Sequence, residues 1–177
     1  LIKSADEIED LAKKVPDNGG VYFVPAFSGL FAPHWRSDAR GVIVGLTRSA
    51  TKAHLARAAL EAICYQSREI LVALAAESGV QLKQLRVDGG ITNNNLCMQI
   101  QADVLQIEIV RPQIVETTAL GAAYAAGLAV GYWKSTDELK AKSAIAKKWS
   151  PNKESELATK GLGQWEKAVS KTLNWLD

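Results

Sequence analysis

A chain of 177 residues, of which 47% are hydrophobic, can bury a substantial core, so its composition predicts one globular domain, or one domain with an appendage. The net charge of +2 argues against a nucleic-acid or membrane surface, because acidic residues are mixed among the lysines that follow Trp133. No apolar run is long enough to span a bilayer, and the first residues do not resemble a signal peptide.

The first half of the chain predicts a short surface helix, two strands around an ordered aromatic loop, and a long helix. These elements cover residues 4–14, 21–24, 41–46 and 51–78, with the loop at 26–35. Ser4 is the expected N-cap of the short helix, with Glu7 as its capping-box partner. The long helix has a broad apolar stripe that should be buried against a sheet, and Gly79 should end it in the left-handed conformation.

The second half alternates strands and helices. Strands are predicted at 84–87 and 107–110, and helices at 94–105, 118–130, 135–147 and 154–175. The helix over 118–130 consists mostly of alanine, glycine and leucine, which fits either close packing or a moving interface. This order of elements predicts an α/β layered domain, with an α/β core over 16–133 and a helical extension over 134–177.

The two cysteines, Cys64 and Cys97, lie in helical patterns with no partner nearby in sequence. This pattern predicts reduced, buried thiols in a cytosolic protein rather than a disulfide or a zinc site. The only histidines, His34 and His54, are far apart and have no ligand residue three or four positions away. The sequence therefore predicts no metal site, and we expect His34 to support the aromatic loop.

A glycine turn after a strand is the strongest candidate for a binding site. Gly89 and Gly90 let the main chain bend and approach a ligand closely, and the free N–H groups of the following helix can face an anion. Asp88 precedes the turn and either caps it or the next helix, which we favour, or touches a metal–nucleotide complex. The phosphate-loop and dinucleotide-binding fingerprints are absent. By itself such a turn is more often only structural.

Several stretches match one pattern in order and spacing from near Gly20 to about Trp133. They are 21–30 (VYFVPAFSGL), 32–35 (APHW), 39–41 (ARG), 45–47 (GLT), 86–90 (RVDGG), Asn94 and 116–123 (ETTALGAA). Together they resemble the C-terminal part of glycerol-phosphorylating members of the FGGY carbohydrate kinase family. The resemblance implies a ribonuclease H-like ATPase fold of the actin and hexokinase type, with a mixed sheet flanked by helices and a C-terminal helical extension.

The resemblance also implies an activity. In such enzymes MgATP transfers a phosphoryl group to a terminal hydroxyl of glycerol, giving glycerol 3-phosphate and ADP. The family's adenosine-side contacts fall on Gly90 and Asn94 of this chain, with Gly89 and Asp88 in the same turn. The resemblance further implies ATP and Mg²⁺ as cofactors, a cytoplasmic homo-oligomer, and a role in domain movement for the small-residue helix.

No residue of this chain matches the family's aspartate base, its first-domain phosphate contacts or its glycerol pocket. The resemblance therefore implies no catalytic or metal-binding residue here, and a segment that is inactive alone. Residues 1–177 are accordingly expected to be a segment of the C-terminal kinase domain, without the N-terminal domain and the start of this one. The only methionine is Met98, which agrees with a chain that is processed or part of something longer.

Three alternatives stay open. A related kinase of the family that acts on a pentulose or another polyol would carry similar sequence motifs in this region. A non-catalytic actin-like module would bind nucleotide and regulate a partner. An α/β domain whose glycine turn binds nothing is the simplest alternative.

Overall fold

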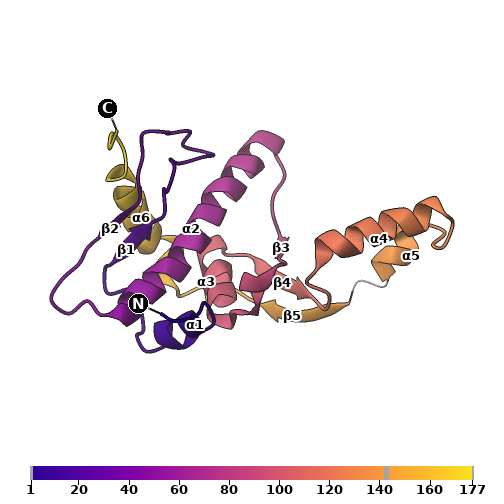
Figure 1. Ribbon diagram of the computed structural model, residues 1–177, viewed down its shortest axis with the longest axis horizontal. Helices are drawn as coiled ribbons and strands as arrows, with labels where there is room; N and C mark the ends of the chain where they lie inside the picture. Colours follow the sequence, from indigo (N-terminus) through magenta and orange to yellow (C-terminus); the bar gives the residue numbers. More distant parts are fainter. Residues whose placement is uncertain (1, 142–143, 177) are drawn as a thin grey trace.

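The computed structural model describes residues 2–141 and 144–176, which form a main body and a projecting arm (Figure 1). Helices α4 and α5 make the arm, and the other helices pack in the main body. In chain order the elements are α1 (Glu7–Ala12), β1 (Tyr22–Val24), β2 (Val42–Val44), α2 (Lys52–Ser78), β3 (Gln84–Arg86), the 3₁₀ turn η1 (Gly90–Asn93), α3 (Asn95–Leu105), β4 (Glu108–Pro112), α4 (Thr117–Ala129), α5 (Thr136–Ala141), β5 (Ile145–Trp149), the 3₁₀ turn η2 (Glu156–Ala158) and α6 (Lys160–Ser170).

The described strands form one two-stranded and one three-stranded sheet. Strands β1 and β2 are antiparallel, with Phe23 opposite Ile43. In the larger sheet β3 runs parallel to β4, and helix α3 makes the crossover between them. Strand β5 then pairs antiparallel with the other edge of β4. The predicted α/β domain with a mixed sheet and flanking helices is confirmed.

The helix predicted over 135–147 is wrong beyond α5. Part of it, 142–143, lies outside the described residues, and the next residues form β5 instead. The reason is non-local: pairing with β4 satisfies the backbone groups of β5 and buries Trp149, which is 6% exposed. Arg111 and Lys147 lie over the Trp149 ring, 5.6 and 5.2 Å from its centre. The segment 134–177, predicted to be a helical extension, thus also adds a strand to the sheet.

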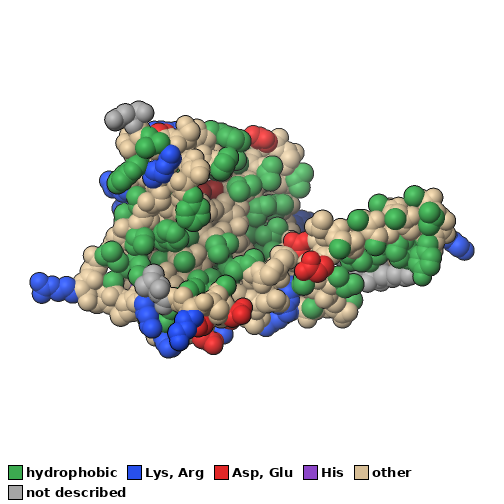
Figure 2. All heavy atoms as spheres, in the orientation of Figure 1, with side chains coloured by type: hydrophobic (Ala, Val, Ile, Leu, Met, Phe, Trp, Pro, Cys, Tyr) green, Lys and Arg blue, Asp and Glu red, His purple; other side chains and the backbone are tan. Residues whose placement is uncertain are grey.

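Helix α2 crosses the main body and contacts α1, α3 and β1 (Figure 1). The buried residues of α2 all lie in its N-terminal half, and the Tyr65 ring stacks on Trp165 of α6 with 5.3 Å between ring centres. Its C-terminal half is not covered, since Ile70 and Leu74 are 44% and 54% exposed. Burial of the whole apolar stripe against a sheet was therefore the wrong expectation. Figure 2 shows apolar side chains on one face of the main body and along the arm.

Helix ends follow local sequence in some places and not in others. Thr51 precedes α2 in an extended conformation and its N–H donates to His54 Nδ1 (3.1 Å), while Gly79 ends the helix with φ of 69°, as predicted. The capping box predicted for α1 is wrong: no side-chain cap is present, and Glu7 accepts from the Lys3 N–H (3.2 Å).

The C-terminal helix and the aromatic loop meet at Glu69 of α2. The helix predicted over 154–175 is shorter and interrupted, as η2 followed by α6. Glu69 Oε1 accepts from Trp165 Nε1 (2.9 Å) and lies 3.0 Å from His34 Nε2. This confirms that His34 supports the loop.

Among the residues that the structure describes, none of the helices combines the length and the apolar character that a membrane span requires.

Gly127→Ala is expected to destabilise the arm by about 1–3 kcal/mol, because the new methyl group would overlap the Trp133 ring. Trp133 folds back over Gly127 and packs edge-on against Tyr124, with 5.1 Å between ring centres. Gly121→Ala is the matched control, since a Cβ there meets no described atom within 4 Å. Alanine favours helix by up to about 1 kcal/mol, so thermal unfolding followed by circular dichroism should show opposite signs for the two variants. Equal effects would contradict the packing argument.

Candidate functional site

The glycine turn joins the end of β3 to the start of α3. The Val87 N–H donates to Val110 O (3.0 Å), which extends the β3–β4 pairing to the edge of the turn. Gly89 has φ of 80°, a conformation that L-residues with side chains rarely adopt. The chain then makes one turn of 3₁₀ helix before α3 begins at Asn95. The predicted sequence of strand, tight turn and helix start is confirmed.

The outer face of the turn is open. A Cβ atom built on Gly89 or on Gly90 would meet no described atom within 4 Å. Unlike Gly89, Gly90 does not have the positive φ that would require glycine. Conformation therefore explains why glycine stands at 89, whereas no contact or backbone angle in the described part of the chain requires glycine at 90.

Asn94 is the N-cap of α3. Its Oδ1 accepts from the Cys97 N–H (2.8 Å), and the residue is only 9% exposed. The sequence suggested a polar side chain available from the first turn of the helix. In the structure its oxygen already accepts one hydrogen bond, and the amide NH₂ group offers two donors to another molecule.

Asp88 does not cap its own turn or helix α3, which was the favoured expectation. Instead its Oδ2 accepts from the hydroxyl of Thr117, at the first position of α4. The Gly89 N–H also donates to Val115 O (3.4 Å). Two contacts thus connect the glycine turn to the start of the arm, and residues 88–90 and 115–117 lie at one place in the fold.

Arg111 adds a positive charge behind the turn. Its Nη1 donates to Thr92 O (2.8 Å) and lies 3.3 Å from Asn93 Oδ1. This contact could not be predicted from the sequence, because it depends on the register between β3 and β4. No group of three or more His, Cys, Asp or Glu side chains in the described part of the chain is placed to hold a metal ion.

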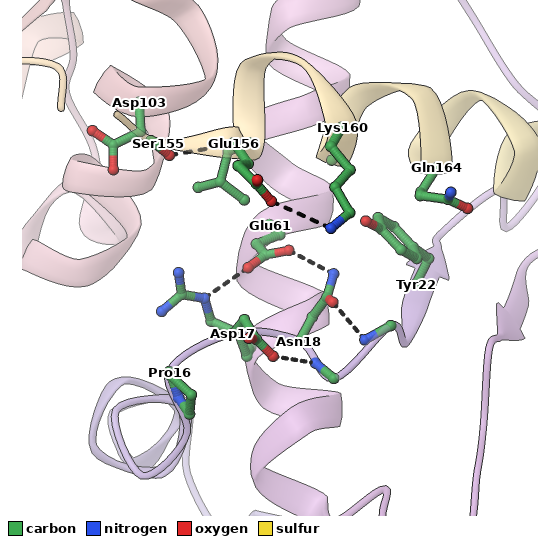
Figure 3. Close-up of a pocket in the computed structure, with 15 residues that line it drawn as sticks. Pro16, Asp17, Asn18, Tyr22, Glu61, Asp103, Ser155, Glu156, Lys160 and Gln164 are labelled. Carbon is green, nitrogen blue, oxygen red and sulfur yellow. Dashed lines mark hydrogen bonds and ion pairs between the residues drawn. The ribbon is translucent and has the colours of Figure 1, made fainter. Parts of the chain in front are cut away.

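A cavity of about 700 Å³ lies elsewhere, between the segment before β1, helix α2 and the start of α6 (Figure 3). At its wall Glu61 is 1% exposed and accepts from Asn18 Nδ2 (2.8 Å) and Arg57 Nε (2.7 Å). Burial raises the pKa of Glu61, and Arg57 opposes that rise. Lys160 pairs with Glu156 at 3.4 Å. These charged groups are paired with one another, so the arrangement does not indicate a ligand.

Asn94→Ala is expected to lower the free energy of unfolding by about 1 kcal/mol, because it removes the cap of α3. Asn94→Asp keeps the acceptor oxygen and should cost less, while it removes the amide NH₂ group. Urea unfolding of the two variants separates capping from any contact to a ligand. Equal losses in both variants would contradict the capping role.

Comparison with known proteins places the chain in a family. Residues 2–130 match the model of the C-terminal domain of the FGGY family of carbohydrate kinases. Over its whole length the chain is 62% identical to a glycerol kinase of Mycolicibacterium gilvum, and the match covers 35% of that protein. It is 61% identical to a glycerol kinase of Mycobacterium tuberculosis, of which the match covers 34%. The chain therefore spans about a third of the length of these relatives.

Solved structures agree. A glycerol kinase of Plasmodium falciparum with ADP superposes with a TM-score of 0.88 at 40% identity, over 97% of this chain and 34% of that one. A xylulose kinase of Rhodospirillum rubrum superposes with a TM-score of 0.77 at 26% identity, over 96% of this chain and 35% of that one. These neighbours are kinases with the ATPase fold of the actin and hexokinase type. The chain belongs to the FGGY family of carbohydrate kinases and corresponds to its C-terminal domain.

Proposed function

We propose that this chain is the C-terminal segment of a glycerol kinase. The full-length protein would transfer a phosphoryl group from MgATP to a terminal hydroxyl of glycerol, giving glycerol 3-phosphate and ADP. The observation that carries the proposal is 62% identity, along the entire chain, to a protein named glycerol kinase. The structural neighbour solved with ADP supports use of a nucleotide by the full-length protein.

In this proposal the glycine turn contacts the adenosine side of the nucleotide. Any side chain at position 90 would occupy the open face of the turn. Because Gly90 has none, the backbone there can approach a planar or sugar group closely. The amide NH₂ group of Asn94 can donate to an acceptor on the same ligand, because its oxygen is held by the Cys97 N–H. Asp88 keeps this turn attached to the start of α4 through Thr117.

The chemistry at the phosphate end belongs to residues outside this chain. Phosphoryl transfer depends mostly on positioning and charge stabilisation, with a carboxylate accepting the hydroxyl proton. We assign the base, the glycerol pocket and the first-domain phosphate contacts to an N-terminal domain and to an earlier part of this domain. Mg²⁺ would enter with the phosphates of ATP, and we assign it no ligand among residues 1–177.

The small-residue helix α4 would take part in domain movement. Its residues are mostly exposed and only Gly127 is buried, so another backbone can approach most of its surface. We further propose that the full-length protein is a cytoplasmic homo-oligomer, as the family resemblance implies.

The test is an acceptor panel with full-length protein, ATP and Mg²⁺, in which ADP release and the phosphorylated product are measured. We expect turnover with glycerol to exceed that with xylulose and gluconate, the substrates named for other neighbours of this fold. If the protein prefers xylulose or gluconate, that compound would replace glycerol as the proposed substrate. Binding of ADP without any turnover would favour the non-catalytic, actin-like module. Residues 1–177 alone should show no turnover, and robust activity would contradict the assignment of the acceptor site elsewhere.

A further inference from the structure

Helix α2 carries an apolar stripe that stays exposed from the middle of the helix toward its C-terminal end. Ile63, Ile70 and Leu74 are 40%, 44% and 54% exposed. Their spacing places them on one side of the helix, because an α-helix completes a turn about every 3.6 residues. We call these three residues the α2 stripe. Val72 is also exposed, but it lies about half a turn away, on the opposite side of α2.

The described neighbours of this part of α2 hold it from its other sides. Arg68 donates from Nη1 to the Val104 carbonyl of α3 (2.8 Å), and Glu69 accepts from Trp165 Nε1 of α6 (2.9 Å). By helical geometry, Arg68 and Glu69 lie more than about a quarter of a turn from each residue of the stripe. The α2 stripe therefore faces away from the contacts that fix the helix to α3 and α6.

Strand β3 is also poorly covered. It is the edge strand of the three-stranded sheet, with β4 as its one described neighbour. Gln84 and Arg86 of β3 are exposed, whereas Ile109 and Val110 of β4 are buried. Parallel strands occur almost only in sheets that are covered on both faces, and the outer edge of a strand is a template for a further strand. The parallel pair β3–β4 thus lacks, at β3, the cover that such pairs normally have.

Further exposed apolar residues join the α2 stripe to β3. Val80 and Leu82, in the connection between the two elements, are 58% and 36% exposed. Figure 2 shows apolar side chains over the part of the main body where Figure 1 places β3 and the C-terminal half of α2. Extended apolar surfaces of this kind mark places where another part of a protein, or another molecule, binds.

The relatives provide enough additional polypeptide to cover this surface. The match extends over the whole of this chain but over only 35% of the first of them. The glycerol kinase with ADP keeps the same fold, with a TM-score of 0.88, although this chain covers only 34% of it. A segment of the same polypeptide is always at high effective concentration, whereas a separate partner has to be recruited.

We propose that the α2 stripe and the outer edge of β3 form one docking surface for an earlier segment of the same polypeptide. The segment adds a strand to β3 and packs apolar side chains on the stripe. An extended segment with alternating apolar and polar residues meets both requirements, because its main chain pairs with the strand edge while the side chains of one face reach apolar surface. The inference rests on the proposed function, since it requires the longer protein.

Leu74→Asp in full-length protein is expected to lower the melting temperature by about 5 °C or more, because it places a charge among the apolar side chains of the docked segment. Val72→Asp is the matched control, with the same charge on the opposite side of the same helix. It should shift the melting temperature by about 2 °C or less. Scanning calorimetry measures both variants, and equal shifts would overturn the proposal.

Photo-cross-linking identifies the occupant without a destabilising charge. p-Benzoylphenylalanine is incorporated in place of Leu74 in full-length protein, which is irradiated, digested and analysed by mass spectrometry. We expect a link to a peptide from the segment that precedes residue 1. Isotope-labelled and unlabelled protein are mixed before irradiation, so that a link within one chain is distinguished from a link between two copies. A link between copies, to another protein, or no link to protein at all would overturn the proposal.

Hydrogen exchange tests the edge of β3 in unmodified full-length protein. We expect the amides of residues 84–87 to exchange as slowly as those of β4, because the added strand accepts hydrogen bonds from the amides that point away from β4. A strand that is paired on one side only has every second amide open to solvent. Fast exchange of about half of these amides would therefore disprove the added strand.

Turnover separates this inference from the proposed function. If full-length protein phosphorylates glycerol while Leu74→Asp and Val72→Asp are equally stable, the docking surface is disproved and the proposed function stands. If the cross-link to the earlier segment forms in a protein that does not phosphorylate glycerol, the docking surface stands and the proposed function is disproved.

Discussion

Arg57→Ala is expected to lower the free energy of unfolding by about 3–5 kcal/mol, one of the largest losses for a single substitution in this chain. The variant leaves the Glu61 carboxylate, whose side chain is 2% exposed, with only the amide of Asn18 as a hydrogen-bond partner. Removing one member of a buried ion pair costs far more than the pair itself contributes, because the other charge stays buried without compensation. Urea unfolding measures the loss.

Arg68→Ala is the matched control for this prediction. Arg68 lies on the same helix and donates from Nη1 to the Val104 carbonyl (2.8 Å), so its loss leaves a neutral acceptor instead of a buried charge. We expect a loss of about 1 kcal/mol there. Similar losses in the two variants would contradict the role of Glu61.

The pH dependence supplies a second check on the Arg57→Ala variant. Burial raises the folded-state pKa of Glu61, and removal of Arg57 takes away an interaction that lowers it. A carboxyl with a raised folded pKa binds its proton more tightly in the folded state, so the unfolding free energy lost in Arg57→Ala is largest above that pKa. This loss should shrink as the pH falls through the folded pKa toward the ordinary glutamate value. A deficit independent of pH would indicate lost packing instead.

Gly90→Val is expected to raise the apparent KM of full-length protein for ATP about tenfold or more. Forcing a branched side chain into occupied space costs about 1–3 kcal/mol, and each 1.4 kcal/mol is a factor of ten in affinity. Within the described part of the chain the variant meets no obstacle, since a Cβ at 90 has no neighbour within 4 Å. The effect should therefore appear in nucleotide affinity and not in folding. Steady-state kinetics with varied ATP measures it.

Gly163→Val serves as the control for Gly90→Val. Gly163 lies in α6, and a Cβ there also meets no described atom within 4 Å. It should leave the KM for ATP unchanged. An unchanged KM in folded Gly90→Val would remove the turn from the nucleotide site.

Local features of the fold could be predicted from the sequence, and features that depend on distant partners could not. Gly79 and the glycine turn were predicted because backbone conformation at these positions depends on the residue itself. Strand β5 was missed because its lysines and alanine suit a helix, and only the edge of β4 makes a strand more stable there. Local propensity is a weak prior where tertiary pairing is available.

The candidate site shows the same division. Gly89, Gly90 and Asn94 are consecutive parts of one local motif, so the sequence placed them together. The contact of Asp88 with Thr117 depends on how the arm leaves the sheet, and that of Arg111 with the turn depends on strand register. Neither contact can be predicted from the periodicity of apolar residues or from the spacing of motifs in the sequence.

Few buried contacts hold the arm together. Of the residues in α4 only Gly127 is buried, and its main partner is the nearby ring of Trp133. Segments with few buried apolar contacts open at a lower free energy than the core to which they are attached. We therefore expect the arm to open at a lower free energy than the main body. Its displacement as one piece would leave the packing of α2 on α3 intact, so motion at the start of α4 does not require the core to loosen.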